Sequence, residues 1–340
     1  MLLRQSIALL LTTFSFASHA QDYVNRPEVA LLRGELVTEH QFDAADFDNA
    51  MAQARRLDQV IAFMDAPVRA PAPWHVYWPR HIGGDRFARA GEFVRDNNTA
   101  LRRAEVAYGV PPEVVAAIIG VETIYGRITG NFRVIDALAT LAFDYPRRAE
   151  FFREELKQFF LLSRELKRSP LSIRGSFAGA MGWPQFMPSS YRKWAVDFDN
   201  DQRIDLFASR EDIVGSVASF LAGHGWERGG VVMLPVAKPS AAILATFDGG
   251  LTPRKAFSEW QAAGVEILRK DANVQLPAGD ALAGLISLDR ADGENEYWIT
   301  FENFYVITRY NRSRMYASSV WSLAYALQRL SAKSSPPTPR

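Results

Sequence analysis

The chain has 340 residues, 48% of them hydrophobic and 12% aromatic, so it can bury a large core and we expect two or three folded units. Its 39 lysines and arginines nearly balance 38 acids, and a net charge of +1 supplies no broad positive field, which excludes nucleic acid as an expected partner. Because cysteine is absent, we expect neither disulfides nor a lipid-anchored N-terminus.

Residues 1–20 have the three-part layout of a secretory signal peptide. Arg4 precedes an apolar run from Ile7 to Phe16, and small residues end at Ala20. The run is far shorter than the roughly twenty residues that span a bilayer. We therefore expect a soluble protein exported to a bacterial periplasm, with no membrane anchor; an uncleaved interfacial anchor is the alternative.

The first two thirds of the mature chain are predicted to be helical. Residues 21–75 form an N-terminal helical segment, with apolar residues at helical spacing up to Met64 and a proline-rich connection before an aromatic cluster at 74–78. Further helices are expected over 86–108, 111–125, 136–143, 144–167 and 212–224. Asp144 could cap the helix that follows it, and Pro146 suits the first turn of that helix.

The composition changes after Trp226. Residues 227–303 predict a small β-rich unit with strands at 231–236, 241–247, 282–289 and 297–301, and a turn at Asp292-Gly293. A C-terminal helix is expected over 311–330, followed by a disordered tail over 333–340.

Glu122 is an isolated acid in the apolar helix expected over 111–125. Val115, Ile118 and Glu122 recur at i, i+3 and i+7, which places the carboxylate on the stripe that such a helix buries. Burial raises a carboxyl pKa and can keep the group protonated as a general acid. The alternative is a structural acid that reaches water or a buried donor.

The acidic segment that begins at Asp197 has the spacing of an EF-hand loop. Carboxylates occupy positions 1, 3, 5 and 9, whereas Gln202 replaces the usual glycine and Ala208 replaces the closing glutamate. Glu211 could close a longer loop, and a solvated acidic turn is the alternative. The expected ligands of a structural Ca²⁺ are Asp197, Asp199, Asp201, Arg203, Asp205 and Glu211.

Four segments together resemble the lytic murein transglycosylase B family. They are Gly-Val-Glu-Thr-Ile-Tyr-Gly-Arg at 120–127, the stretch 136–152, the glycine-rich run 175–191 and the acidic loop. The resemblance implies an α+β, mainly α chain with a lysozyme-like core over 76–226, which contains a helical insert at about 136–172 and an EF-hand-like loop at 197–211. It also implies the small β domain at 227–303 and a helix at 304–332 that returns to the core.

The same resemblance assigns roles to individual residues. It implies that Glu122 is both the catalytic acid and the catalytic base. Residues that match substrate contacts of the family are Ser176, Gln185, Tyr310, Asn311, Tyr316, Tyr77, Arg147 and Arg148. Taken alone, the two arginines could be exposed helix residues and the two late tyrosines could be core aromatics.

The implied reaction cleaves the β-1,4 bond between N-acetylmuramic acid and N-acetylglucosamine in peptidoglycan and leaves 1,6-anhydro ends. No cofactor is expected for catalysis. Most glycosidases use two carboxylates, and Asp136 and Asp144 are the candidates for a second one, although each suits a helix start. The alternatives are a muramidase that uses water and a non-catalytic scaffold that binds glycan. Glycan strands are the expected partner, with cell-wall synthases or other murein enzymes as further candidates.

Overall fold

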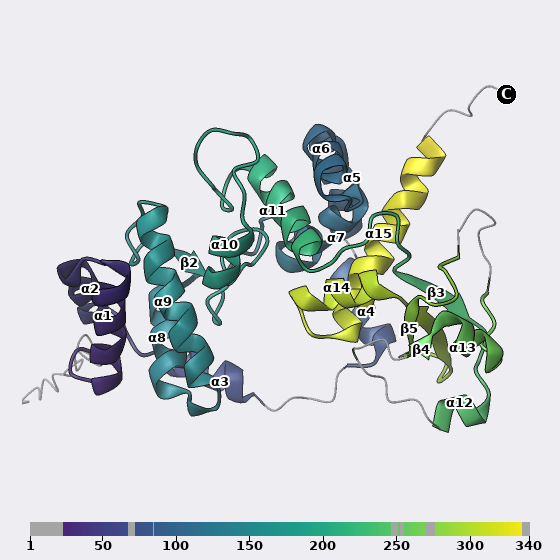
Figure 1. The fold of residues 1–340 in the computed structure, drawn as a ribbon, viewed down its shortest axis with the longest axis horizontal. Helices are drawn as coiled ribbons and strands as arrows, with labels where there is room; N and C mark the ends of the chain where they lie inside the picture. The colour runs from purple at the N-terminus through teal and green to yellow at the C-terminus, as the bar shows by residue number, and fades with distance from the viewer. Residues whose placement is uncertain are drawn as a thin grey trace, which may run out of the picture.

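Helices make up most of an elongated molecule, with a small helical unit at one end and a β-sheet at the other (Figure 1). The computed structural model describes residues 23–66, 72–83, 85–245, 251, 255–268 and 276–334. The expected signal peptide at 1–20 and most of the expected tail lie outside the described residues. The prediction of a mainly helical α+β chain is confirmed.

The N-terminal unit contains three helices where the sequence showed one continuous helical pattern. They are α1 (Pro27–His40), α2 (Ala44–Ala52) and α3 (Asp58–Asp65). The carboxylate of Asp43 accepts a hydrogen bond from the backbone N–H of Asp46 and so begins α2. Phe42 and Phe47 both pack against Phe160, which attaches this unit to the helical insert.

The helical insert is a pair of helices, α8 (Val134–Asp144) and α9 (Ala149–Glu165), joined by the short 3₁₀ helix η1 (Pro146–Arg148). The expectation that Asp144 caps the second helix is wrong. Asp144 instead ends α8, and its carboxylate accepts a hydrogen bond from Arg26 at 2.8 Å. Because η1 separates the two helices, Asp144 lies too early in the chain to cap α9.

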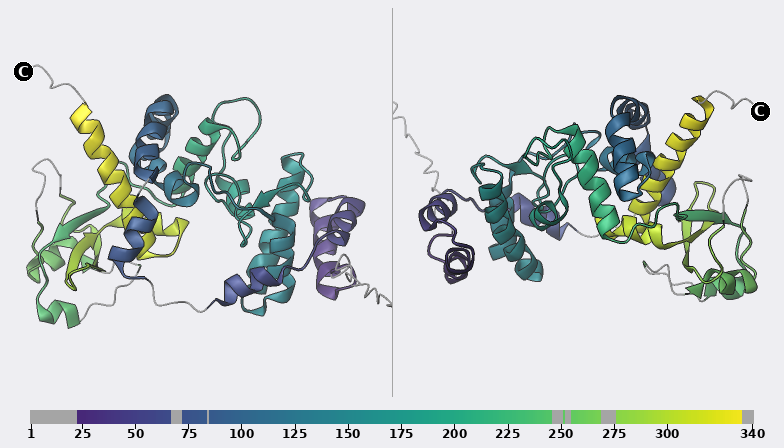
Figure 2. Two further views of the ribbon diagram at one scale, coloured as in Figure 1. Left: turned by 180° about the vertical axis from the view of Figure 1, so that it is seen from behind. Right: turned by 45° about the horizontal axis from the view of Figure 1, so that its top comes forward.

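Six further helices and a two-stranded sheet build the middle of the molecule (Figures 1 and 2). The expected helix at 86–108 is divided into two at Asn97. The helices are α4 (Trp74–Ile82), α5 (Asp85–Asp96), α6 (Asn98–Tyr108), α7 (Pro112–Thr123), α10 (Pro188–Trp194) and α11 (Arg210–Gly223). The antiparallel sheet pairs β1 (Phe132–Arg133) with β2 (Arg174–Gly175).

The second sheet is antiparallel with strand order β3-β6-β5-β4. Its strands are β3 (Met233–Val236), β4 (Lys255–Ala256), β5 (Leu282–Asp289) and β6 (Asn295–Thr300). Gly293 has a φ of 82° in the turn between the last two strands, where the sequence predicted a turn. The strand predicted at 241–247 is wrong over its described part, because the alanine-rich segment after Ser240 forms helix α12 (Ala241–Ala245). Helix α13 (Phe257–Ala262) was not predicted.

Opposite faces of strand β6 belong to two different cores. Tyr297 and Ile299 are buried in a small core with Phe257 and Trp260, whereas Trp298 packs against the main helical core. Successive side chains of a strand point to opposite faces, so a single strand can join both units. Helices α14 (Glu302–Tyr310) and α15 (Arg314–Ser334) then return the chain to the middle of the molecule.

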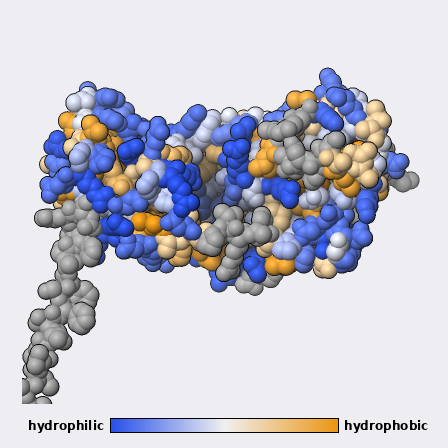
Figure 3. Space-filling model, turned by 90° about the horizontal axis from the view of Figure 1, so that it is seen from below, coloured by the Kyte–Doolittle hydropathy of each residue, from blue (hydrophilic) through white to orange (hydrophobic). Residues whose placement is uncertain are grey.

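The surface is hollowed between the two ends of the long axis when the molecule is seen from below (Figure 3). Within the described ranges, no single helix is both long and apolar enough to cross a membrane. Helices α6 and α7 meet that criterion only as a pair, and they are bent by 114° relative to each other.

Gly120 lies inside α7 because the ring of Tyr125 occupies the space beside it. A Cβ at this position would lie 2.4 Å from the Tyr125 hydroxyl oxygen. We expect Gly120→Ala to lower the free energy of unfolding by about 1–3 kcal/mol, the usual cost of overpacking. Urea unfolding measures this change.

Gly34→Ala in α1 is the matched control, because no atom lies within 4 Å of the added Cβ. Alanine stabilises a helix interior by up to about 1 kcal/mol relative to glycine. Equal effects of the two substitutions would contradict the packing of Tyr125 against Gly120.

Candidate active site

Helix α7 delivers Glu122 to the site from an almost wholly buried helix. All residues from Pro112 to Val121 are buried, and Glu122 is half-buried one residue before the helix ends. The apolar sequence that made this acid conspicuous therefore forms the core of the molecule. A carboxylate at the end of such a helix is held firmly and is only partly hydrated.

The chain turns sharply after Glu122 through three successive left-handed residues. Ile124, Tyr125 and Gly126 have φ values of 52°, 56° and 81°. The hydroxyl of Thr123 donates a hydrogen bond to the Trp183 carbonyl at 2.9 Å and accepts one from the Gly126 N–H at 3.1 Å. A side chain at position 126 would overlap the Trp183 ring, so only glycine fits there.

Tyr316 of α15 donates a hydrogen bond of 2.6 Å to Oε1 of Glu122. Burial raises the pKa of the Glu122 carboxyl to about 7, against the lowering effect of the Tyr316 hydrogen bond. Near neutral pH the carboxyl is thus divided between its acid and carboxylate forms. Such a group can donate a proton in one step and accept one in the next.

Tyr310 stacks beside Tyr316 at the end of α14. Their ring centroids are 6.4 Å apart and the planes differ by 14°. The Tyr310 hydroxyl donates a hydrogen bond of 2.7 Å to the Pro184 carbonyl. This contact fixes the glycine-rich segment against the C-terminal helices. Asn311 follows as an exposed residue at the end of α14.

Ser176 and Gln185 lie in the glycine-rich run 175–191, in the part that folds back on itself before α10 begins at Pro188. The Ser176 hydroxyl accepts a hydrogen bond from the Ala180 N–H. The Gln185 amide donates to the carbonyls of Thr129 at 3.1 Å and Gly182 at 2.9 Å, and its φ of 52° marks a tight turn. The segment is therefore hydrogen-bonded to the chain that follows α7, at Thr129, seven residues after Glu122.

Tyr77 is the substrate-contact candidate that comes from α4. Burial raises the pKa of its hydroxyl, and the nearby negative charge of Glu122 raises it further. Trp74 stacks on the same ring at 6.5 Å between centroids. Tyr77 therefore lies close enough to Glu122 for the charge of the carboxylate to affect its hydroxyl.

The predicted pair Arg147 and Arg148 contacts the helical insert and α3. Arg147 forms an ion pair with Asp65, and the Arg148 guanidinium lies 4.5 Å from the ring centroid of Phe151. Both arginines are exposed. No described contact of either residue involves Glu122.

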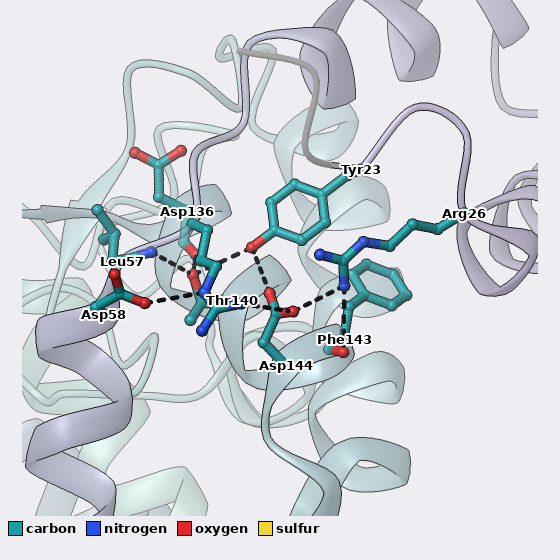
Figure 4. Close-up of polar contacts among 9 residues, drawn as sticks. Tyr23, Arg26, Leu57, Asp58, Asp136, Thr140, Phe143 and Asp144 are labelled. Carbon is teal, nitrogen blue, oxygen red and sulfur yellow. Dashed lines mark hydrogen bonds and ion pairs between the residues drawn. The ribbon is translucent and has the colours of Figure 1, made fainter. Parts of the chain in front are cut away.

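The two candidates for a second carboxylate are both engaged in structural contacts. Asp136 pairs with Arg133 at 2.7 Å, and Asp144 pairs with Arg26 at 2.8 Å while accepting a hydrogen bond from Tyr23 at 3.0 Å. In Figure 4 Tyr23 and Arg26 bond to Asp144, and the Leu57 N–H bonds to Thr140; these contacts attach the N-terminal unit to α8. Both carboxylates therefore have partners in the scaffold; Asp136 lies at a helix start as expected, whereas Asp144 ends α8 instead of starting the next helix.

The acidic loop brings together a different set of carboxylates from the predicted one. Oxygen atoms of Asp197, Asp199 and Asp212 all lie within 4.8 Å of one another. Asp212 was not predicted, because it lies in the first turn of α11 and beyond the EF-hand spacing. Glu211 is not in this group. Gln202 adopts a φ of 69°, the left-handed conformation for which the loop normally uses glycine.

The other predicted loop residues support the turn itself. Asp201 accepts a hydrogen bond from the Arg203 N–H, and Asp205 accepts bonds from the N–H groups of Phe207 and Ala208. Buried Asp212 accepts bonds from two backbone N–H groups of the loop. The arrangement offers hard oxygen ligands to a cation such as Ca²⁺.

Thr123 and Trp183 are positioning residues that sequence reasoning missed. The signal was weak: a polar residue directly after the conspicuous acid, and an aromatic residue within a run of small residues. Neither pattern indicates that the hydroxyl of one residue bonds to the carbonyl of the other.

Comparison with known proteins identifies the family. The transglycosylase SLT domain matches residues 25–325. The membrane-bound lytic murein transglycosylase B of Escherichia coli K12 is 41% identical over 316 residues, covering 90% of this chain and 84% of the relative. The chain belongs to the lytic murein transglycosylase B family. It is accordingly an enzyme that cleaves the peptidoglycan glycan without using water.

Two solved structures show how closely the fold is shared. Lytic transglycosylase SltB1 from Pseudomonas aeruginosa superposes with a TM-score of 0.85 at 40% identity, covering 91% of this chain and 99% of that chain. The E. coli lytic transglycosylase Slt35, solved in complex with calcium, gives a TM-score of 0.80 at 40% identity and covers 91% and 95%. The lysozyme-like architecture expected from the sequence is therefore confirmed.

Tyr316→Phe tests the electrostatic role of the hydrogen bond to Glu122. The bond stabilises the carboxylate, so its loss should raise the pKa of Glu122 further while burial persists. We expect the basic limb of the pH profile of kcat/KM to move upward by about one unit, as the loss of one charge-assisted bond implies.

Tyr310→Phe is the control, because its hydroxyl donates to a backbone carbonyl and not to Glu122. Profiles measured on sacculi should show a smaller displacement for this variant. An unchanged or lowered pKa in Tyr316→Phe would contradict the assigned role of the hydrogen bond.

Proposed function

We propose that Glu122 is the sole carboxyl group that carries out the reaction of this transglycosylase. The observation that carries the proposal is a half-buried acid with a pKa of about 7, bonded to Tyr316 at the end of the central helix. Asp136 and Asp144 are paired in the scaffold and leave the second role to another group.

The substrate supplies that second group. The 2-acetamido oxygen of N-acetylmuramic acid attacks the anomeric carbon as protonated Glu122 gives its proton to the leaving glycosidic oxygen. The resulting carboxylate then takes the proton of the 6-hydroxyl of the same sugar. Attack by that oxygen displaces the acetamido oxygen and closes the 1,6-anhydro ring. This reaction consumes no water. Because Glu122 is half-buried, water has limited access to the reacting carbon, which favours ring closure over hydrolysis.

The surrounding residues orient the sugar. We assign Ser176, Gln185 and Tyr316 to the sugar and its acetamido group, with Tyr310 and Asn311 behind them and Tyr77 on the opposite side. The turn contacts of Gln185 and the Tyr310–Pro184 bond support a rigid wall, which lowers the entropic cost of holding a reactive geometry. The exposed Arg147 and Arg148 would contact only a more distant part of the strand.

We also propose that the acidic loop holds a structural Ca²⁺. Asp197, Asp199 and Asp212 would be its side-chain ligands, and the remaining predicted residues, Asp201, Arg203, Asp205 and Glu211, would complete or support the loop. Three carboxylates with close oxygens repel one another without a cation. The calcium complex of the relative Slt35 supports this proposal.

The place of action follows from the substrate and the N-terminal sequence. We propose export by residues 1–20 and action in the periplasm, where peptidoglycan strands are the principal partner and cell-wall synthases are candidate recruiters. The relatives include the membrane-bound E. coli transglycosylase B and the soluble SltB1 of P. aeruginosa.

Glu122→Gln tests the single-carboxyl mechanism. An amide cannot exchange the proton, so we expect release of 1,6-anhydro fragments from sacculi to fall by at least about 100-fold with the fold intact. Mass spectrometry distinguishes anhydro ends from hydrolysed ends, because the latter carry one additional water.

Glu113→Gln is the matched control, since Glu113 lies in the first turn of the same helix. It should retain activity. Substantial anhydro product from Glu122→Gln would refute the assignment, and hydrolysed ends from the wild-type enzyme would favour the muramidase alternative.

Calcium binding predicts a stability change that depends on the loop. At about 100 times its dissociation constant, Ca²⁺ should stabilise the protein by about 2.7 kcal/mol and raise Tm by several degrees. Asp199→Asn should abolish this gain, whereas Asp46→Asn, an exposed change in α2, should preserve it. Scanning calorimetry with Ca²⁺ and with chelator measures both. A gain unaffected by Asp199→Asn would place the ion elsewhere.

A further inference from the structure

A cavity of about 580 Å³ lies between strand β3, strand β6 and helices α4 and α15, apart from Glu122. Its volume falls within the range of about 300–1,000 Å³ typical of ligand sites. Four of the chain's eight tryptophans line it, namely Trp74, Trp78, Trp298 and Trp321. Tyr325 adds a fifth aromatic side chain.

Polar side chains also line this tryptophan-lined cavity. Glu296 comes from the sheet, and Gln328 and Arg329 come from the last turns of α15. The indole N–H of Trp298 is buried and has no hydrogen-bond partner in the described structure. A purely apolar ligand would leave these groups unpaired at a cost, whereas a sugar offers both C–H faces for the rings and hydroxyls for the polar groups.

Two helices connect the cavity with the catalytic acid. On α4, Trp74 lines the cavity and stacks on Tyr77 at 6.5 Å, and Tyr77 is affected by the charge of Glu122. On α15, Tyr316 bonds to Glu122 and Trp321 lines the cavity five residues later. These two positions are about 7.5 Å apart along the helix axis but about 140° apart around it, so α15 presents them on different faces and the stack of Trp74 on Tyr77 is the aromatic link between cavity and acid.

We propose that the tryptophan-lined cavity is a distal saccharide-binding site that holds a second part of the glycan strand whose bond lies at Glu122. The inference rests on the proposed function. The occupant is a chain of N-acetylated sugars, because aromatic faces combined with hydrogen-bonding side chains suit it and because Trp74, which lines the cavity, stacks on Tyr77 near Glu122. The site gives the enzyme a preference for long strands.

The test compares two substrates, uncross-linked glycan strands and a single tetrasaccharide of the same repeat. The exposed Trp78 is changed to alanine, and Gln328→Ala serves as a second variant on a different helix. We expect each to lower the ratio of kcat/KM on long strands to kcat/KM on tetrasaccharide by about tenfold, the loss of about 1.4 kcal/mol. Leu31→Ala, an exposed apolar change on α1, should leave the ratio unchanged.

Binding provides an arm that does not depend on catalysis. Calorimetric titration of long strands into Glu122→Gln protein should show weaker binding when Trp78→Ala is added. Unchanged ratios and unchanged long-strand affinity in both cavity variants would overturn the proposal, as would cavity-dependent binding of phospholipid vesicles without any effect on glycan. Absence of anhydro ends from the wild-type enzyme would instead count against the proposed function, since the binding arm would be unaffected.

Discussion

The hydrogen bond between Tyr316 and Glu122 joins parts of the chain that lie 194 residues apart. It requires α15 to return from the β unit to the central helix α7, and the two helices pack directly on each other. Burial of α7 fixes the acid and raises its pKa, while the tyrosine hydroxyl limits that rise. The packing of the β unit and the positions of α14 and α15 therefore affect the pKa of Glu122, although Glu122 belongs to α7.

The sequence predicted the elements that are governed by local pattern. An acid in an apolar helix identified Glu122, and strand alternation identified β5 and β6. Local pattern failed where short segments were ambiguous: the apolar residues at 241–247 suit either a strand or a helix, and Ser240 decided for α12 by accepting bonds at its start. Asp144 failed as a cap because η1 separates it from α9, and its carboxylate instead binds Arg26 and Tyr23.

Contacts between distant segments could not be predicted from residue types alone. Tyr316 was found only through resemblance to a family, because a tyrosine in an apolar helix is ordinarily a core residue. The resemblance did not identify Asp212 either. Counting Asp197 as position 1 of the loop, Asp212 is position 16 and lies in the first turn of α11, where it faces the loop. Thr123 likewise matters through the Trp183 carbonyl, a backbone atom that any residue would supply.

A lone acid imposes a requirement on the rest of the fold. With Asp136 bonded to the Arg55 N–H and Asp144 paired with Arg26, both carboxylates attach the N-terminal unit, so the protein cannot stabilise the developing positive charge of the sugar with a second carboxylate from that pair. The acetamido group must then stabilise this charge, so it has to be placed precisely. Precise placement requires rigid residues around the sugar and a glycan strand that is held in one position. Turn contacts of the glycine-rich segment supply the first, and aromatic side chains along α4 and α15 are suited to the second.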